Sequence, residues 1–175
     1  MLNYNVPVIA RGTKTLELVF EHITKDITEK PKRLFIVFNS SGGSVSEMWK
    51  QIALIAHYQQ KGIRVETVVF DACHSACVNI YLMGTKRYAV KNARMIVHQS
   101  RLSGMGLMDK EVIKELKRIS MQSIVHQCGR LKKDDTWCVN HYERTKSDWL
   151  LYPEDMLQEG FSHEIITDYR DLIDL

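Results

Sequence analysis

The sequence of 175 residues has no apolar run close to the ~20 residues that a membrane-spanning helix needs. It also has no block of like charge, because its 24 basic and 21 acidic residues are dispersed and leave a formal net charge of only +3. This balance disfavours nucleic acid and a membrane surface as partners. The first residues show neither the cationic region nor the apolar core of a signal peptide. We therefore expect one globular domain over residues 1–175, located in the cytoplasm.

Cysteine is scarce, with four residues at Cys73, Cys77, Cys128 and Cys138. In a cytoplasmic protein we expect all four to be reduced thiols. An alternative is that Cys73, His74 and Cys77 bind a metal ion. A zinc site needs four tetrahedral ligands, however, and here one short turn would have to supply three of them. The spacing therefore does not favour a metal site.

Proline is scarce too, with three residues, so most of the chain is open to regular structure. Hydrophobic periodicity predicts strands at 6–10, 34–38, 63–70, 87–90, 94–98 and 161–167. It predicts helices at 15–27, 44–60, 75–83 and 108–128, one from 134 or 135 to 145, and a short one from 153 to 160. Strands that alternate with helices through short links are typical of an α/β domain with a mostly parallel sheet.

Several residues signal where these helices begin and end. Ser44 followed by Glu47 is the pattern of a capping box at a helix start. Gly62 and Gly129 are placed as helix stops. Pro153 suits the first position of the short helix before residue 160.

Against this background, three segments stand out because each comes where an apolar strand-like run ends. They are Asn39–Ser44, which holds a glycine turn, Cys73–Cys77, which holds a serine, and Met95–Gln99, which holds a histidine. In parallel sheets functional groups gather at the carboxyl ends of the strands. A glycine turn, a serine and a histidine together supply an oxyanion hole, a nucleophile and a general base. The order of the three segments therefore predicts a serine hydrolase.

Ser75 is the candidate nucleophile and His98 the candidate base. A serine hydroxyl becomes reactive when a base removes its proton, and an imidazole titrates in the range that suits this step. The small Ala76 would place a backbone N–H at a helix start, where donors have no helical partner. The alternatives are that Ser75 is an N-cap serine and His98 a histidine satisfied at a strand end. We expect the neighbouring side chain of His74 to point away from the nucleophile.

A third group must hold the imidazole in the correct tautomer. Asp148 is the candidate, because it ends a polar stretch just before an apolar run and is placed to lie at the edge of the core. Composition alone does not separate it from Asp71, Asp155 and Asp168, and an aspartate at a helix end is the structural alternative.

The three segments resemble those of the ClpP family of self-compartmentalising serine peptidases, within the wider ClpP/crotonase superfamily. Asn39–Ser44 is similar to the family's Asn-Ser-Pro-Gly-Gly, Met95–Gln99 to its Met-Ile-His-Gln, and residues 145–148 to its Thr-x-Arg-Asp. The resemblance puts Ser75 at the nucleophile position, selects Asp148 as the triad acid and assigns the oxyanion donors to the N–H groups of Gly43 and Ala76. It implies neither a metal nor an organic cofactor.

The resemblance also implies an architecture. The fold would consist of repeated β-β-α units with a mostly parallel central sheet and a protruding handle helix, in a handle region of about residues 99–130. Seven subunits would form a homo-oligomeric ring, two rings would stack through the handles, and residues 100–106 would hold a peptide or unfolded protein by β-augmentation.

Departures from the family pattern bear on the partners. The chain before the glycine turn is shorter than in typical members, and the missing part would carry the loop that meets an AAA+ unfoldase. Lys146 and Ser147 replace the acidic residue and the arginine that precede the triad aspartate, and that arginine takes part in ring–ring contacts. Serine endopeptidase is the leading interpretation. The alternatives are a catalytically inactive ClpP-like assembly subunit and a crotonase-type acyl-CoA enzyme, which would need no Ser-His-Asp set.

Overall fold

A computed structural model describes residues 7–8, 18, 20–21, 33–101 and 109–172. The strands are β1 (Pro7–Val8), β2 (Arg33–Ser40), β3 (Arg64–His74), β4 (Arg87–Val90), β5 (Arg94–Val97), β6 (Trp149–Leu151) and β7 (Glu164–Ile166). The helices are α2 (Val45–Gln60), α3 (Ala76–Tyr81), α4 (Lys110–Leu131), α5 (Asp135–Arg144), α6 (Pro153–Gln158) and the 3₁₀ turn η1 (Tyr169–Leu172). Most elements predicted from periodicity are therefore present. The helix predicted at 15–27 is described only at residues 18, 20 and 21, which are helical.

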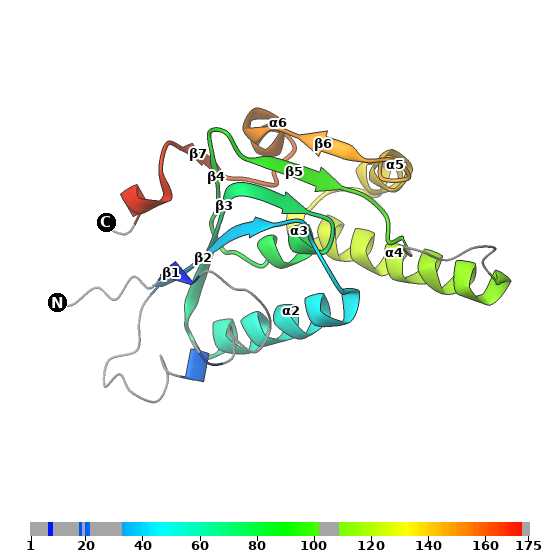
Figure 1. The fold of residues 1–175 in the computed structure, drawn as a ribbon, viewed down its shortest axis with the longest axis horizontal. Coiled ribbons are helices and arrows are strands. Elements are labelled where there is room, and N and C mark those ends of the chain that lie inside the picture. The colour runs from blue at the N-terminus through cyan, green and yellow to red at the C-terminus, as the bar shows by residue number, and fades with distance from the viewer. Residues whose placement is uncertain (1–6, 9–17, 19, 22–32, 102–108, 173–175) are drawn as a thin grey trace.

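The strands form one seven-stranded sheet in the order β1-β2-β3-β4-β7, with β5 pairing both β3 and β6. Every pairing is parallel except that of β5 with β6. Figure 1 shows the sheet with α2 and α3 on one side and α4 extending away from it past the strand ends. The predicted mixed α/β fold with a mostly parallel sheet and a protruding helix is confirmed.

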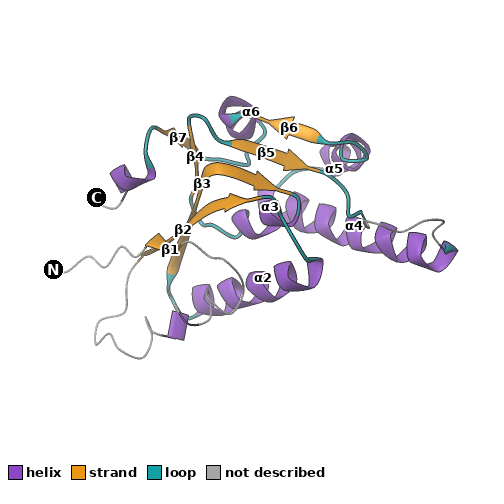
Figure 2. Cartoon of the chain, viewed as in Figure 1, coloured by secondary structure: helices purple, strands orange, loops and turns teal. Residues whose placement is uncertain are grey.

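The central strand β3 is longer than the predicted 63–70 and continues to His74. Residues 64–69 and Cys73 pair with β2, residues 67–69 also pair with β4, and residues 72–74 pair with β5. The extension carries the chain from the middle of the sheet to the end of β5. Because of it, the segment that follows β3 begins beside the segment that follows β5 (Figure 2).

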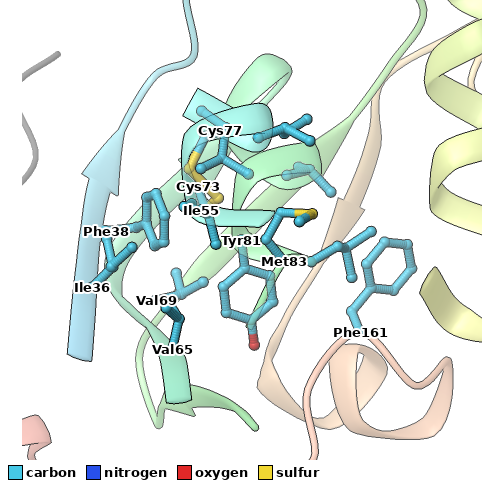
Figure 3. Close-up of a cluster of buried hydrophobic side chains, with 14 of the residues drawn as sticks. Ile36, Phe38, Ile55, Val65, Val69, Cys73, Cys77, Tyr81, Met83 and Phe161 are labelled. Carbon is cyan, nitrogen blue, oxygen red and sulfur yellow. A yellow bond between two sulfur atoms is a disulfide. The ribbon is translucent and has the colours of Figure 1, made fainter. Parts of the chain in front are cut away.

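The main core lies between the sheet and helices α2 and α3. Alternate residues of β2 and β3 face these helices, among them Ile36, Val65 and Val69, and they pack against Tyr81 of α3 (Figure 3). The opposite face of the sheet carries a smaller buried cluster, against which Leu172 of η1 packs. Strands that are covered on both faces have nearly continuous apolar sequences, as β2 does.

The helix ends follow the sequence signals at most positions. The Ser44 hydroxyl accepts a hydrogen bond from the N–H of Glu47 at the start of α2, and Gly62 follows the end of α2 with φ +88°. The carboxylate of Asp134 caps α5, and Pro153 occupies the first turn of α6. The predicted cap serine, stop glycine and first-turn proline are thus confirmed.

The predicted stop of the long helix at Gly129 is wrong. Helix α4 continues through Gly129 to Leu131 and ends at Lys132, which adopts a left-handed conformation with φ 54°. The guanidinium of Arg130 donates hydrogen bonds to the carbonyls of Leu82 and Met83, at 2.8 and 3.0 Å, and so holds the last turn against α3. This tertiary contact outweighs the local preference of glycine to end a helix. At the other end, Asp109 caps the helix.

The expectation of four reduced cysteines is also wrong for this structure. Cys73 pairs with Cys77 and Cys128 pairs with Cys138, so no free thiol remains. The second disulfide joins the end of α4 to α5, with 5.9 Å between the two Cα atoms. Sequence reasoning missed it because pairing depends on a Cα separation that only the packing of the two helices creates. Within the described residues, no helix combines the length and apolar character that crossing a membrane requires.

Candidate active site

The glycine turn after β2 lies directly against the turn after β3. Gly42 has φ +97°, and a Cβ added to it would lie 2.7 Å from the carbonyl oxygen of His74 and 2.8 Å from the Cβ of Ser75. Only glycine fits there, both for its backbone conformation and for the space available. Two of the three predicted segments are therefore in van der Waals contact. A pocket of about 600 Å³ borders Gly42, Gly43 and Ala76.

Ser75 occupies a sharp turn between β3 and α3. Its φ and ψ are 57° and −124°, values that a residue with a side chain rarely adopts and that cost of the order of 1–3 kcal/mol. The Ser75 N–H donates to the carbonyl of Ile96 at 2.8 Å, which ties the turn to β5. Although Ser75 stands at the N-cap position of α3, its hydroxyl caps no N–H of that helix. The interpretation of Ser75 as an ordinary capping serine is therefore wrong.

The register between β3 and β5 brings His98 to this turn. His74 pairs with Ile96 in the parallel ladder, and Ser75 and His98 follow these two strands. Because parallel strands end at the same edge of a sheet, the nucleophile and base candidates leave the sheet side by side. Both residues are half-buried.

The register between β5 and β6 brings in Asp148. In this antiparallel pair Val97 faces Trp149, so the next pair along the register is His98 opposite Asp148. Residues directly opposite in an antiparallel pair have Cβ atoms about 4.5–5.5 Å apart and point to the same face. Ser75, His98 and Asp148 therefore flank the ends of three neighbouring strands, in that order across the sheet.

The other candidate aspartates are used elsewhere. The carboxylate of Asp155 accepts from the N–H of Tyr152 at 2.9 Å, which caps α6. Asp168 binds the guanidinium of Arg170, and these hydrogen bonds lower the pKa of Asp168 to about 2. Asp71 lies on β3 and pairs with Arg94. Among the four aspartates, the strand register singles out Asp148.

The side chains of His98 and Asp148 nevertheless contact other groups. The Nδ1 atom of His98 lies 2.7 Å from the carbonyl oxygen of Gln99. Since a carbonyl only accepts, the neutral ring carries its proton on Nδ1 and leaves Nε2 as the acceptor. The carboxylate of Asp148 pairs with the guanidinium of Arg101, with 2.8 Å between Oδ1 and Nη2. The tautomer thus suits a general base, while the carboxylate is held by a different partner.

Gln99 fixes the end of β5 against the end of α5. Its N–H donates to the carbonyl of Thr145 at 2.9 Å, and its side-chain amide donates to the carbonyl of Tyr142 at 2.8 Å. The Thr145 hydroxyl in turn donates to the carbonyl of His141. These bonds position the short connection that leads from α5 to Asp148.

His74 belongs to the surroundings of the site, although sequence reasoning considered it only as a metal ligand and gave it no catalytic role. Burial lowers the pKa of His74, with smaller contributions from Arg94 and His98 in the same direction and from Asp71 and Asp148 in the opposite direction. Its Nε2 atom is buried without a hydrogen-bond partner among the described residues. The sequence signal that could have indicated a role for His74 is its position directly before Ser75.

The disulfide between Cys73 and Cys77 brackets Ser75. The two Cα atoms are 5.3 Å apart, and both residues are buried. Because the sulfur atoms bind one another, they are not available as thiolate ligands, and the structure does not support the alternative of a metal site at Cys73, His74 and Cys77. The described residues contain no cluster of three or more side chains suited to a metal ion.

Comparisons with known proteins agree with this fold. Among solved structures, a mutant form of ClpP1 from Listeria monocytogenes superimposes with a TM-score of 0.72 at 23% sequence identity, covering 92% of this chain and 84% of that chain. At this identity the match shows a shared fold. The family model described as Clp protease matches residues 13–168, which include the glycine turn, Ser75, His98 and Asp148. The chain therefore belongs to the Clp protease family.

Proposed function

We propose that the chain is a serine endopeptidase that cleaves peptides or unfolded proteins with Ser75, His98 and Asp148. The observation that supports this proposal most is the strand register, because β3, β5 and β6 are neighbours and Ser75, His98 and Asp148 each lie next to the end of one of them. The positive φ of Ser75 and the glycine turn packed on it support the same assignment, because a sharp strand-to-helix turn is the setting in which a nucleophilic hydroxyl projects beside backbone donors.

In the proposed reaction the Ser75 hydroxyl attacks the peptide carbonyl while Nε2 of His98 takes its proton. The resulting oxyanion accepts hydrogen bonds from the N–H groups of Gly43 and Ala76, which are fixed before the reaction begins. His98 then delivers the proton to the leaving amine, which leaves an acyl ester on Ser75. A water molecule, deprotonated by His98, hydrolyses this ester and restores the serine. Asp148 holds the imidazole in the Nδ1–H tautomer throughout.

For the third residue to act, the imidazole must exchange its partner. Nδ1 of His98 has to leave the carbonyl of Gln99 and donate to Asp148, which comes opposite it when the β5–β6 register is continued by one residue. The exchange takes place within one pair of strands and keeps the proton on the same nitrogen. Side-chain rotation on this scale is fast compared with typical turnover.

The family also motivates a proposal for the assembly. We propose that the chain forms a homo-oligomeric ring, with α4 as the handle through which two rings stack and with the active sites inside. The first half of α4 supports this, because residues 110–119 include no fully buried side chain within the single chain. Residues 102–106 of the substrate-holding strand predicted at 100–106 lie outside the described residues. An AAA+ unfoldase is a further proposed partner, and a cytoplasmic location remains a proposal.

A second candidate function is that of a non-catalytic assembly subunit. The observation in its favour is that His98 and Asp148 bind other groups in this structure. An assembly subunit would keep the fold and the oligomer without turnover. The two candidates predict different chemical reactivity of Ser75.

Labelling with a fluorophosphonate probe tests the proposal, because the probe forms a covalent adduct only with an activated serine. Labelling is mapped by mass spectrometry in the parent protein, in Ser75→Ala and in His98→Ala, with Ser147→Ala as a control for an exposed serine near the site. We expect an adduct on Ser75 that disappears in the first two variants and persists in the third. In a folded ring, an unlabelled Ser75 together with no cleavage of unfolded casein would favour the non-catalytic subunit.

A further inference from the structure

We propose that Arg101 is an autoinhibitory latch that holds the Asp148 carboxylate away from His98 and thereby keeps the triad apart until Arg101 is released. This inference rests on the proposed function, since it concerns the regulation of the same site. It follows from two contacts around the end of β5 and from the register of β5 with β6.

The first two contacts describe the resting arrangement. Oδ1 of Asp148 lies 2.8 Å from Nη2 of Arg101, and Nδ1 of His98 lies 2.7 Å from the carbonyl oxygen of Gln99. The third observation is the β5–β6 register, which pairs Val97 with Trp149 and, continued by one residue, brings His98 opposite Asp148. The carboxylate that stands opposite the imidazole is therefore turned toward a guanidinium, and the imidazole donates to its own neighbour instead.

Arg101 is the cation that forms an ion pair with the Asp148 carboxylate. Three nearby cations of the site and of its supporting loop have carboxylate partners of their own. These pairs are Arg94 with Asp71 at 3.3 Å, Arg144 with Glu159 at 3.2 Å and Lys146 with Glu143 at 2.6 Å. His74 also interacts electrostatically with Asp148, but burial lowers the pKa of His74 and so favours the neutral form of its ring. Near neutral pH, Arg101 is thus the described partner that pairs with Asp148 as an ion.

The exposure of the pair makes the latch reversible. The side chains of Arg101 and Asp148 are 51% and 56% exposed. Exposed ion pairs are weak and are screened by salt, so they shift a two-state equilibrium by about two- to fivefold rather than blocking it. Raised ionic strength, or an anionic group that competes for the guanidinium, would release Asp148 to accept the Nδ1 proton of His98.

The test compares fluorophosphonate labelling rates at low and high sodium chloride in the parent, Arg101→Gln, Arg101→Lys and Arg94→Gln. The Arg94–Asp71 pair is a matched control, because its side chains have similar exposure, 55% and 47%, and Arg94 lies on the same strand, β5, but at its opposite end. We expect Arg101→Gln to label Ser75 about two- to fivefold faster at low salt and to lose the acceleration that salt gives the parent. Arg101→Lys and Arg94→Gln should behave like the parent. Equal rates and equal salt dependence in Arg101→Gln and the parent would overturn the latch.

A second readout separates the latch from the proposed function. Nuclear magnetic resonance of ¹⁵N-histidine-labelled protein reports the hydrogen-bond partner of the His98 Nδ1–H without any turnover, with His98→Ala assigning the signal. We expect the Nδ1–H proton to move downfield in Arg101→Gln, as donation passes from a carbonyl to a carboxylate. If Ser75 stays unlabelled in every variant while this shift occurs, the endopeptidase fails and the latch stands. If Ser75 is labelled and the shift is absent, the latch fails and the endopeptidase stands.

Discussion

Gly42 lies so close to Ser75 that a side chain on the glycine would begin 2.8 Å from the serine Cβ. The contact joins the turn after β2 to the turn after β3. Under the proposed mechanism it fixes the direction in which the backbone donors of the glycine turn point relative to the nucleophile. The relationship makes the glycine turn the most direct place to test the site by substitution.

Gly42→Ala should therefore disable the site. The new methyl group would meet the backbone at His74 and the Ser75 side chain, and the φ of +97° disfavours any side chain. Because the turn must shift, we expect a loss of about 10²–10³-fold in peptide hydrolysis, the scale of losing one oxyanion donor. Gly62→Ala is the matched control: its φ is +88°, but no atom lies within 4 Å of the added Cβ. That variant should lose about 1 kcal/mol of unfolding free energy and keep its activity. Equal activity losses in the two variants would contradict this account.

Asp148→Asn should lower the rate of peptide hydrolysis by about 10⁴-fold, because an amide stabilises the wrong tautomer of the imidazole. Steady-state kinetics on a fluorogenic peptide measures the effect. Asp155→Asn is the control, since Asp155 caps α6 through the N–H of Tyr152. It should lower the unfolding temperature with little change in rate. A comparable loss of rate in both variants would remove Asp148 from the triad.

Reduction of the Cys73–Cys77 disulfide should slow the labelling of Ser75. The bridge closes a short ring around the serine and restricts the turn in which Ser75 takes its left-handed conformation. We expect dithiothreitol and Cys77→Ala each to lower the labelling rate several-fold. Reoxidation of the reduced parent should restore its original labelling rate. Cys138→Ala opens the other disulfide, between α4 and α5, and should lower thermal stability without this effect. Labelling that is indifferent to reductant would show that the bridge does not position the nucleophile.

Stability should fall in mild acid because of His141. This side chain is 1% exposed and stacks on Trp137, and burial lowers its pKa to about 4. The unfolded chain, with a histidine pKa near 6.5, binds the proton more readily than the folded one. The contribution of the neutral ring is therefore complete above pH 6.5 and is lost as the pH falls toward 4, by up to about 3 kcal/mol.

Urea unfolding between pH 7 and pH 4 measures this dependence. The buried ring bonds to the side-chain oxygen of Gln127, which in turn bonds to Asn79 of α3, so His141→Gln should weaken the fold while flattening the pH dependence. His126, whose pKa is also lowered by burial, leaves a smaller slope of the same sign. His57→Gln, on an exposed face of α2, should leave the slope unchanged. A parent slope that survives in His141→Gln would assign the acid sensitivity to other groups.

Local patterns predicted most of the elements because their causes are local. The apolar run at Leu34–Phe38 indicates a strand buried on both faces, and Ser44 and Gly62 mark the ends of α2 through hydrogen bonds within one turn, by the side chain of Ser44 and the N–H of Gly62. Gly129 misled for the opposite reason, because Arg130 holds the last turn of α4 through carbonyls of a distant segment. Helix propensity describes a segment in isolation, whereas the folded chain adds tertiary contacts with residues outside that segment.

By itself, the sequence determined the alternation of strands and helices and the placing of the glycine turn, Ser75 and His98 each directly after a strand. These properties depend on periodicity and order along the chain, and the family pattern added Asp148. The tertiary structure decided which strands are neighbours, and hence that the β5–β6 register pairs Val97, just before His98, with Trp149, just after Asp148. It also decided the two disulfides and the pairing of Arg101 with Asp148. Each of these joins groups whose separation in space is set by packing, and packing is a property of the whole chain rather than of any segment.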